Sequence, residues 1–154
     1  MLLPHWEQRH PDHLACSRLG YDACFLAGLK KVDLDGEPFR PRKIAYVSYF
    51  RNTDYSFLVD ISDVFIRKIR AAAAYTSQFG DPEEIIAAIE KGNSLRGLSN
   101  ADRPVFHSSI SAFELIQTRA RQLGQLVHVD YAEAFTIKEQ MLVDDPQKLP
   151  VKSI

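Results

Sequence analysis

The chain has 154 residues, of which 45% are hydrophobic and 25% charged, with a formal net charge of -1. This composition is typical of one soluble globular domain, and the near-neutral charge, with no basic stripe among aromatic residues, argues against nucleic-acid binding. No segment is apolar for long enough to cross a bilayer, and Met1–Trp6 lacks the regions of a signal peptide, so we expect a cytoplasmic protein without membrane partners.

Met1–Pro4 predicts the last residues of a buried strand, and it leads into the most reactive segment, Arg9-His10-Pro11-Asp12-His13. Pro11 biases His10 towards extended backbone, and Asp12 is a good N-cap for a helix over about 12–29. Ligands of open α/β sheets bind outside the carboxyl ends of strands, where this segment would lie. On spacing alone, however, a capping aspartate beside solvated histidines explains the segment better than a metal site does.

Two cysteines, Cys16 and Cys24, fall on the first predicted helix. They are too far apart along that helix to form a disulfide with each other. We therefore expect both to be buried as small apolar side chains.

The remaining pattern predicts an α/β fold. Strands are expected at 44–50, 57–61 and 126–129, and helices at 62–79 (capped by Ser62), at 83–91, and from Ser109 or Ser111 to Gly124. These few short strands predict the second half of a larger Rossmann-like doubly wound sheet with flanking helices, over residues 1–143, followed by a polar tail, 144–154. Such a half-sheet exposes an apolar edge that another chain or segment must cover.

Four stretches occur in the order seen in one family: Trp6–His13, Leu58–Ser62, Ala74–Phe79 and Asp130–Phe135. Over about residues 4–135 the chain resembles the carboxyl-terminal part of the LmbE-like (PIG-L type) zinc-dependent N-acetylglucosamine deacetylases. The resemblance is weakest over 82–106. Within the family the chain looks most like the bacillithiol-biosynthesis branch, which acts on N-acetylglucosaminyl malate.

The resemblance implies a role for each polar residue of the segment. His13 would be a Zn²⁺ ligand, and His10 would polarise the acetyl carbonyl or stabilise the tetrahedral intermediate. Asp12 would orient His10 and keep it protonated. Arg9 would support the loop beside the substrate, and Arg40 would pair with a carboxylate such as that of malate, although a surface arginine explains Arg40 equally well.

Two further residues of the shared stretches, Tyr131 and Glu133, are expected to shape a turn and pack on the reactive loop rather than to act in catalysis. This expectation, too, rests on the resemblance.

The family's amino-terminal His-Pro-Asp-Asp motif, which supplies two zinc ligands and the general base, does not occur in this sequence. One histidine cannot hold a catalytic zinc, which ordinarily has three protein ligands. His5 and His107 are weak substitutes because no carboxylate accompanies either. The chain alone is therefore predicted to be inactive.

Two hypotheses remain. The chain is part of a zinc deacetylase of acetylated amino sugars and pairs with an amino-terminal half or forms a homo-oligomer. Alternatively, it is a non-catalytic assembly module that keeps the family scaffold. The joint presence of His10, Asp12 and His13 favours the first hypothesis.

Overall fold

The structure is a computed structural model that describes residues 1–33, 35–47, 54–76, 81–91 and 112–151. Its centre is a sheet of four strands in the order β1 (Leu2–Pro4), β2 (Ala45–Val47), β4 (Ala132–Thr136) and β3 (Phe57–Asp60). The predicted α/β class with flanking helices is confirmed. A Rossmann-like order is not, because β4 runs antiparallel to both of its neighbours and only β1 and β2 are parallel among the described strands.

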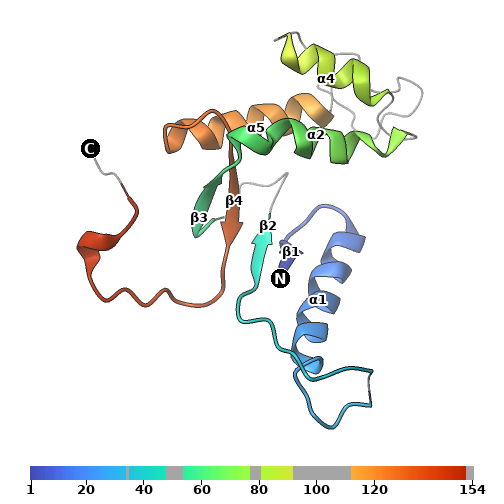
Figure 1. Cartoon of the computed structure of the whole chain (residues 1–154), viewed down its shortest axis with the longest axis vertical. Coiled ribbons are helices and arrows are strands. Elements are labelled where there is room, and N and C mark those ends of the chain that lie inside the picture. The colour runs from blue at the N-terminus through green and yellow to red at the C-terminus, as the bar shows by residue number, and fades with distance from the viewer. Residues whose placement is uncertain (34, 48–53, 77–80, 92–111, 152–154) are drawn as a thin grey trace.

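Helix α1 (Pro11–Leu26) connects the parallel strands β1 and β2 and lies beside β1 (Figure 1). The prediction of a strand at the start of the chain is confirmed, but its burial is not. Within the described residues β1 pairs with β2 alone, and Leu2 remains 66% exposed. β1 is therefore an edge strand of the described sheet, with an unused row of backbone hydrogen-bonding groups.

Two predicted helix caps are wrong. His10, not Asp12, is the N-cap of α1, with Pro11 at the first helical position, where the missing amide of proline costs no hydrogen bond. Ser62 does not cap a helix, because its hydroxyl donates to the carboxylate of Asp60 at 2.6 Å. Ser62 instead begins a 3-10 turn, η1 (Ser62–Val64), ahead of helix α2 (Phe65–Ala73). The predicted helix end near residue 79 is wrong, because Ala74 is the C-cap of α2.

The predicted strand over 126–129 is also wrong, because helix α5 (Ala112–Leu126) continues past its expected end at Gly124. Gly124 is buried against the chain that follows, and a Cβ atom there would lie 2.5 Å from the carbonyl oxygen of Val129. The amides of Val127 and Val129 both donate to the Gly124 carbonyl at 3.0 Å, and His128 has a left-handed φ of 60°. This tight turn reverses the chain into β4.

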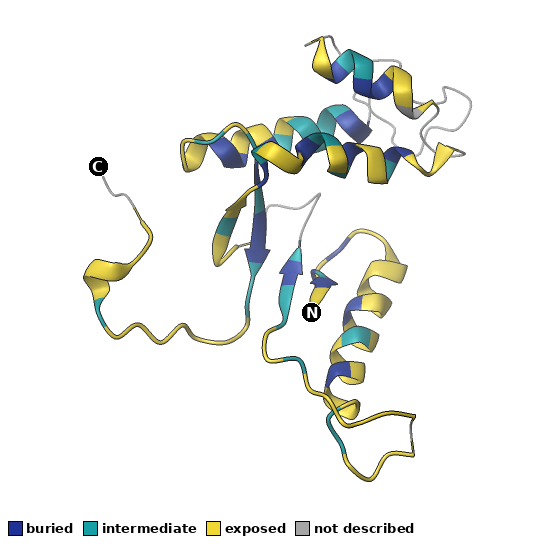
Figure 2. Ribbon diagram, in the orientation of Figure 1, coloured by how far each residue is buried: buried dark blue, intermediate teal, exposed yellow. Residues whose placement is uncertain are grey.

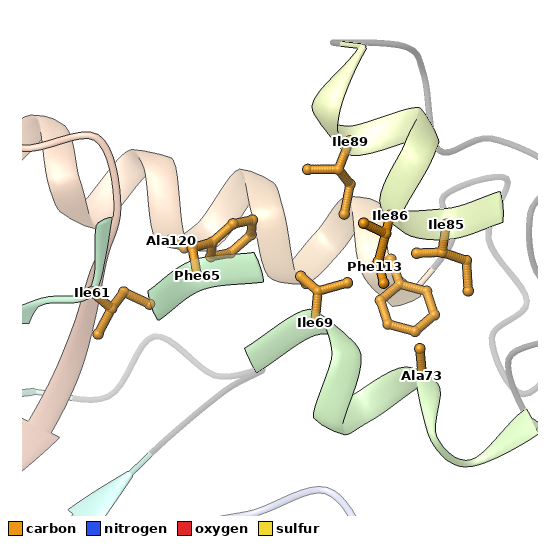
Figure 3. Close-up of a cluster of buried hydrophobic side chains, with 9 residues drawn as sticks. All are labelled: Ile61, Phe65, Ile69, Ala73, Ile85, Ile86, Ile89, Phe113 and Ala120. Atoms are coloured by element: carbon orange, nitrogen blue, oxygen red, sulfur yellow. The ribbon is translucent and has the colours of Figure 1, made fainter. Parts of the chain in front are cut away.

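A hydrophobic core joins α2, α5 and helix α4 (Pro82–Glu90) at one end of the sheet (Figures 1 and 3). The buried side chains recur at helical spacing in the sequence, so each of the three helices has an apolar stripe that faces this core. The buried members are Ile61, Phe65, Ile69, Ala73, Ile85, Ile86, Ile89, Phe113 and Ala120. A smaller cluster of Leu123, Ala132 and Ala134 packs α5 on the sheet.

Helix α1 is far less covered than the other helices (Figure 2). Its buried residues are Ser17 and Cys24, whereas Leu14, Leu19, Phe25 and Leu26 are exposed. The burial predicted for the cysteines is thus confirmed for Cys24 and wrong for Cys16, which is exposed. The apolar positions of α1 suit a helix, as predicted, but they do not form a packed face within the described chain.

After β4 the chain runs in extended form across residues 137–151, with one 3-10 turn, η2 (Pro146–Lys148). In the described part of the chain, no helix has the length and apolar character that a membrane span requires.

Truncation of Phe113 should strongly destabilise the protein. This side chain lies on α5 and is fully buried in the core that α5 forms with α2 and α4. Phe113→Ala removes a ring and leaves a cavity, so we expect the free energy of unfolding to fall by about 3–5 kcal/mol. Urea denaturation measures this change. Phe39→Ala is the matched control, because Phe39 is 70% exposed; an equal loss in both variants would contradict this account of the core.

Candidate functional site

The carbonyl oxygen of Val47, at the carboxyl end of β2, fixes the loop that follows β1. The amide of His5 donates to this oxygen at 2.9 Å, and the side-chain amide of Gln8 donates to it at 3.4 Å. His5 and Gln8 are both buried. The loop between β1 and α1 is thereby attached to the end of the parallel strand pair.

The imidazole of His5 serves this loop as a structural acceptor. Its Nδ1 accepts the backbone N–H of Glu7 at 3.0 Å, and its ring stacks on Trp6 with centroids 4.0 Å apart. Burial lowers the pKa of His5 below its ordinary value of 6.5; the charge of Lys138 acts in the same direction, and Glu7 opposes both. His5 is therefore held neutral, with a ring nitrogen already engaged, whereas His107, the other substitute ligand considered, lies outside the described residues.

His10 has the extended backbone that Pro11 predicts, with φ -90° and ψ 132°. Its Nδ1 accepts the backbone N–H of Asp12 at 3.2 Å, so in this arrangement Nδ1 carries no proton and Nε2 carries one. The Asp12 carboxylate lies 3.6 Å from the same Nδ1 atom, beyond hydrogen-bond distance. The backbone N–H of Asp12 thus orients the His10 ring, and the role of the Asp12 carboxylate in keeping His10 protonated stays a prediction.

His13 lines a pocket of about 350 Å³ that runs along β1 to the edge where β1 and β2 end. Pro4 and Val47, the last residues of the two strands, lie in its wall together with Gln8 and Glu133. The rings of His10 and His13 have centroids 5.8 Å apart, at the first turn of α1. The place predicted for a ligand, outside the carboxyl ends of parallel strands, is therefore a pocket that contains His13.

Glu133 reaches this pocket from β4, where it pairs with Val59 of β3. The ammonium of Lys68 on α2 donates to a carboxylate oxygen of Glu133, and both side chains are about four-fifths buried. Sequence reasoning gave Glu133 a packing role only. The sequence holds no signal for the ion pair, because Lys68 and Glu133 are 65 positions apart and spacing along the chain does not reveal such a contact.

Tyr131, expected to shape a turn and pack on the reactive loop, packs against α2 and α5. Its ring stacks on Phe65 with centroids 3.8 Å apart, and its hydroxyl accepts hydrogen bonds from Gln117 at 3.4 Å and from Arg121 at 3.2 Å. Tyr131 lines a second pocket, of about 390 Å³, with Arg121, Gln125, Val129 and Asp130.

The two predicted substrate-binding arginines are placed differently. Arg9 is exposed directly beside His10. Arg40 lies at the opposite end of α1, where its guanidinium donates to the Phe25 carbonyl at 3.3 Å and covers the Phe25 ring at 4.8 Å. Because Phe25 follows His13 by 12 residues on α1, about 18 Å of helix separates Arg40 from the nearer histidine. The described chain does not bring Arg40 to the pocket.

These residues do not by themselves fit a catalytic zinc. Within residues 1–33, 35–47, 54–76, 81–91 and 112–151, no three His, Cys, Asp or Glu side chains gather in a way that could hold a metal ion. Three protein ligands are the usual set of a catalytic zinc site. His13 can supply one of them, and the others would have to come from outside the described residues.

Comparison with known proteins finds similarity to a deacetylase and to a solved structure, and no family profile matches the sequence. A stretch of 78 residues is 35% identical to diacetylchitobiose deacetylase from Thermococcus kodakarensis, covering 49% of this chain and 28% of that protein. The structure resembles that of the conserved protein TT1542 from Thermus thermophilus, with a TM-score of 0.65 and 31% identity over 92% of this chain.

The chain spans about half the length of TT1542, at 52%, and less than a third of the deacetylase. The similarity to a deacetylase supports the resemblance to LmbE-like deacetylases in general, and it does not extend to the bacillithiol branch.

The Lys68–Glu133 pair predicts a measurable coupling energy. Because water is largely excluded from both side chains, removing one partner leaves a poorly solvated charge. A double-mutant cycle with Lys68→Met and Glu133→Gln should give a coupling of about 1–3 kcal/mol in chemical denaturation.

The exposed pair Lys148–Asp145, with nitrogen and oxygen 3.9 Å apart, is the matched control and should couple by less than about 0.5 kcal/mol. Equal coupling in the two pairs would show that burial does not strengthen the Lys68–Glu133 interaction.

The neutral state of His5 predicts a pH dependence of stability. The unfolded chain takes up a proton on His5 near pH 6.5, whereas burial disfavours that proton in the folded chain. The free energy of unfolding should therefore fall as the pH drops below 6.5. His5→Asn keeps an acceptor for the Glu7 amide and should reduce this slope. His128→Asn, at an exposed left-handed position, should leave it unchanged.

Proposed function

We propose that this chain forms the carboxyl-terminal part of an N-deacetylase that acts on N-acetylglucosamine-type sugars. The observation that carries the proposal is the position of His13 in a pocket at the carboxyl ends of β1 and β2. The similarity to diacetylchitobiose deacetylase, although partial, supports the reaction class of amide hydrolysis.

In this proposal His10 contributes a hydrogen bond to the reacting group. Because its Nδ1 is occupied by the Asp12 amide, the proton on Nε2 is available to the oxyanion that develops at the acetyl carbonyl oxygen. The position of His10 as the N-cap of α1 holds the ring at the start of the helix, beside His13. Such fixed donors stabilise a transition state without reorganisation during the reaction.

Zinc belongs to the proposal as the cofactor of the complete site, with His13 as one ligand. Gln8 and Glu133 share its pocket and would form the polar wall around it. The remaining ligands would come from a second part of the domain, which would also extend the sheet at β1 into a Rossmann-like arrangement. The open edge of β1 and the exposed apolar side chains of α1 support a partner on this side.

The finer assignments are part of the same proposal. N-acetylglucosaminyl malate would be the substrate if Arg9 or Arg40 pairs with its carboxylates. Since Arg40 lies at the far end of α1, it would serve a site completed by another copy of the chain, which requires a homo-oligomer.

Acetate release and zinc content test the proposal in the chain co-expressed with the amino-terminal half of a LmbE-like deacetylase. His13→Ala should lower zinc affinity by at least about 100-fold and abolish acetate release. His10→Ala should leave zinc content unchanged and lower kcat by about 100–1000-fold.

His128→Asn is the matched histidine control and should change neither quantity, because His128 is exposed at the α5–β4 turn. A folded complex that binds no zinc, or that releases no acetate from N-acetylglucosamine, diacetylchitobiose or N-acetylglucosaminyl malate, would overturn the proposal.

The second candidate is a non-catalytic assembly module, favoured by the missing three-ligand cluster in the described residues. It requires a chain that is stable and monodisperse without zinc and whose thermal midpoint is unchanged by His13→Ala. Aggregation of the isolated chain would argue against it, because a module must tolerate its own open sheet edge.

A further inference from the structure

The ammonium of Lys138 lies over three aromatic rings at once. Its Nζ atom is 4.7 Å from the ring centroid of Trp6, 5.0 Å from that of Tyr21 and 5.1 Å from that of Tyr46. All three distances are within the range at which the negative face of an aromatic ring attracts a cation. No other cation in the described part of the chain lies over three rings.

The three rings come from separate elements. Trp6 is in the loop after β1, Tyr21 is on α1 and Tyr46 is on β2, whereas Lys138 belongs to the extended chain after β4. The rings of Trp6 and Tyr46 meet edge to face at 84°, with centroids 4.8 Å apart, so they form two adjoining walls beside the cation. An arrangement of this kind is typical of sites that recognise ammonium groups.

The surroundings favour a cation at this point. Within the described chain, Lys138 makes no ion pair with a carboxylate, so the rings are its principal partners. Tyr46 is 2% exposed and its buried hydroxyl has no hydrogen-bond partner among the described residues. Trp6 and Tyr21 keep part of their surface in water, so solvent reaches the edge of the site that Lys138 occupies.

We propose that Trp6, Tyr21 and Tyr46 form a binding site for an alkylammonium group, which Lys138 fills in this structure. By filling it, Lys138 holds the chain after β4 against the loop that continues to His10 and His13. An alkylammonium ligand enters the same site when the Lys138 side chain is removed. This proposal is independent of the deacetylase function.

The protein contains one tryptophan, so the fluorescence of Trp6 reports directly on the site. Lys138→Ala and Lys138→Met should shift Trp6 emission, because both remove the cation, and Lys138→Met preserves most of the apolar volume. Lys138→Arg should retain the wild-type emission. Lys148→Ala is the matched control, since Lys148 is exposed and far along the same chain segment.

Tetramethylammonium chloride is the external probe. It should produce a saturable change in the Trp6 emission of Lys138→Ala and a much smaller one in the wild-type chain, where Lys138 competes. Sodium chloride at equal ionic strength and tert-butanol, a neutral molecule of similar shape, should produce no saturable change.

Circular dichroism and the thermal midpoint establish that each variant is folded. Wild-type emission in folded Lys138→Met, or no response of folded Lys138→Ala to tetramethylammonium, would overturn the proposal. If Lys138→Ala fails to fold, Lys138→Met is compared with Lys138→Arg. Wild-type emission in Lys138→Arg but not in Lys138→Met supports a cation site. Equal emission in the two variants contradicts it.

Discussion

The site of this protein depends on the parallel pairing of β1 with β2, which brings two strand ends to one edge of the sheet. The carbonyl oxygen of Val47 at that edge accepts hydrogen bonds from the His5 amide and the Gln8 side chain. These two bonds fix a loop of irregular backbone, whose buried polar groups would otherwise be unsatisfied. Because α1 begins directly after this loop, the position of the loop sets the positions of His10 and His13.

The opposite wall of the pocket depends on the turn that joins α5 to β4. Gly124 allows the backbone of residues 129 and 130 to approach the helix, and no side chain could replace it without displacing that backbone. The turn sets the register in which Glu133 lies opposite Val59. Lys68 then fixes the carboxylate from α2, so a helix, two strands and a turn together determine one polar group of the pocket.

Helix α1 and the histidine pair both present groups that the described chain leaves uncovered. A helix with apolar side chains at Leu14, Leu19 and Leu26 in water lacks the cover that such side chains usually have. A pocket with His13 but without two further ligands in the described chain lacks the set that a catalytic zinc requires. The chain spans about half the length of TT1542, whose structure it resembles.

The sequence by itself determined the α/β class, the core stripes of α2 and α5, the extended backbone of His10 and the location of a reactive loop at a strand end. Each follows from interactions between residues close together in the chain: helical periodicity places Phe65, Ile69 and Phe113, and Pro11 restricts its predecessor. One prediction from neighbouring residues was nevertheless wrong. Both His10 and Asp12 could cap the start of α1, and the structure uses His10.

Only the tertiary structure decided which strand is central, which residues share the pocket and where the aromatic cation site lies. Leu126–Val129 has the composition of a strand, but the close approach of Val129 to Gly124 makes it the end of a helix and a turn, and the strand is formed by Ala132–Thr136. Contacts such as Lys68–Glu133 and Lys138–Tyr46 join residues more than sixty positions apart. Local pattern carries no information about such pairs, because their geometry exists only once the sheet has formed.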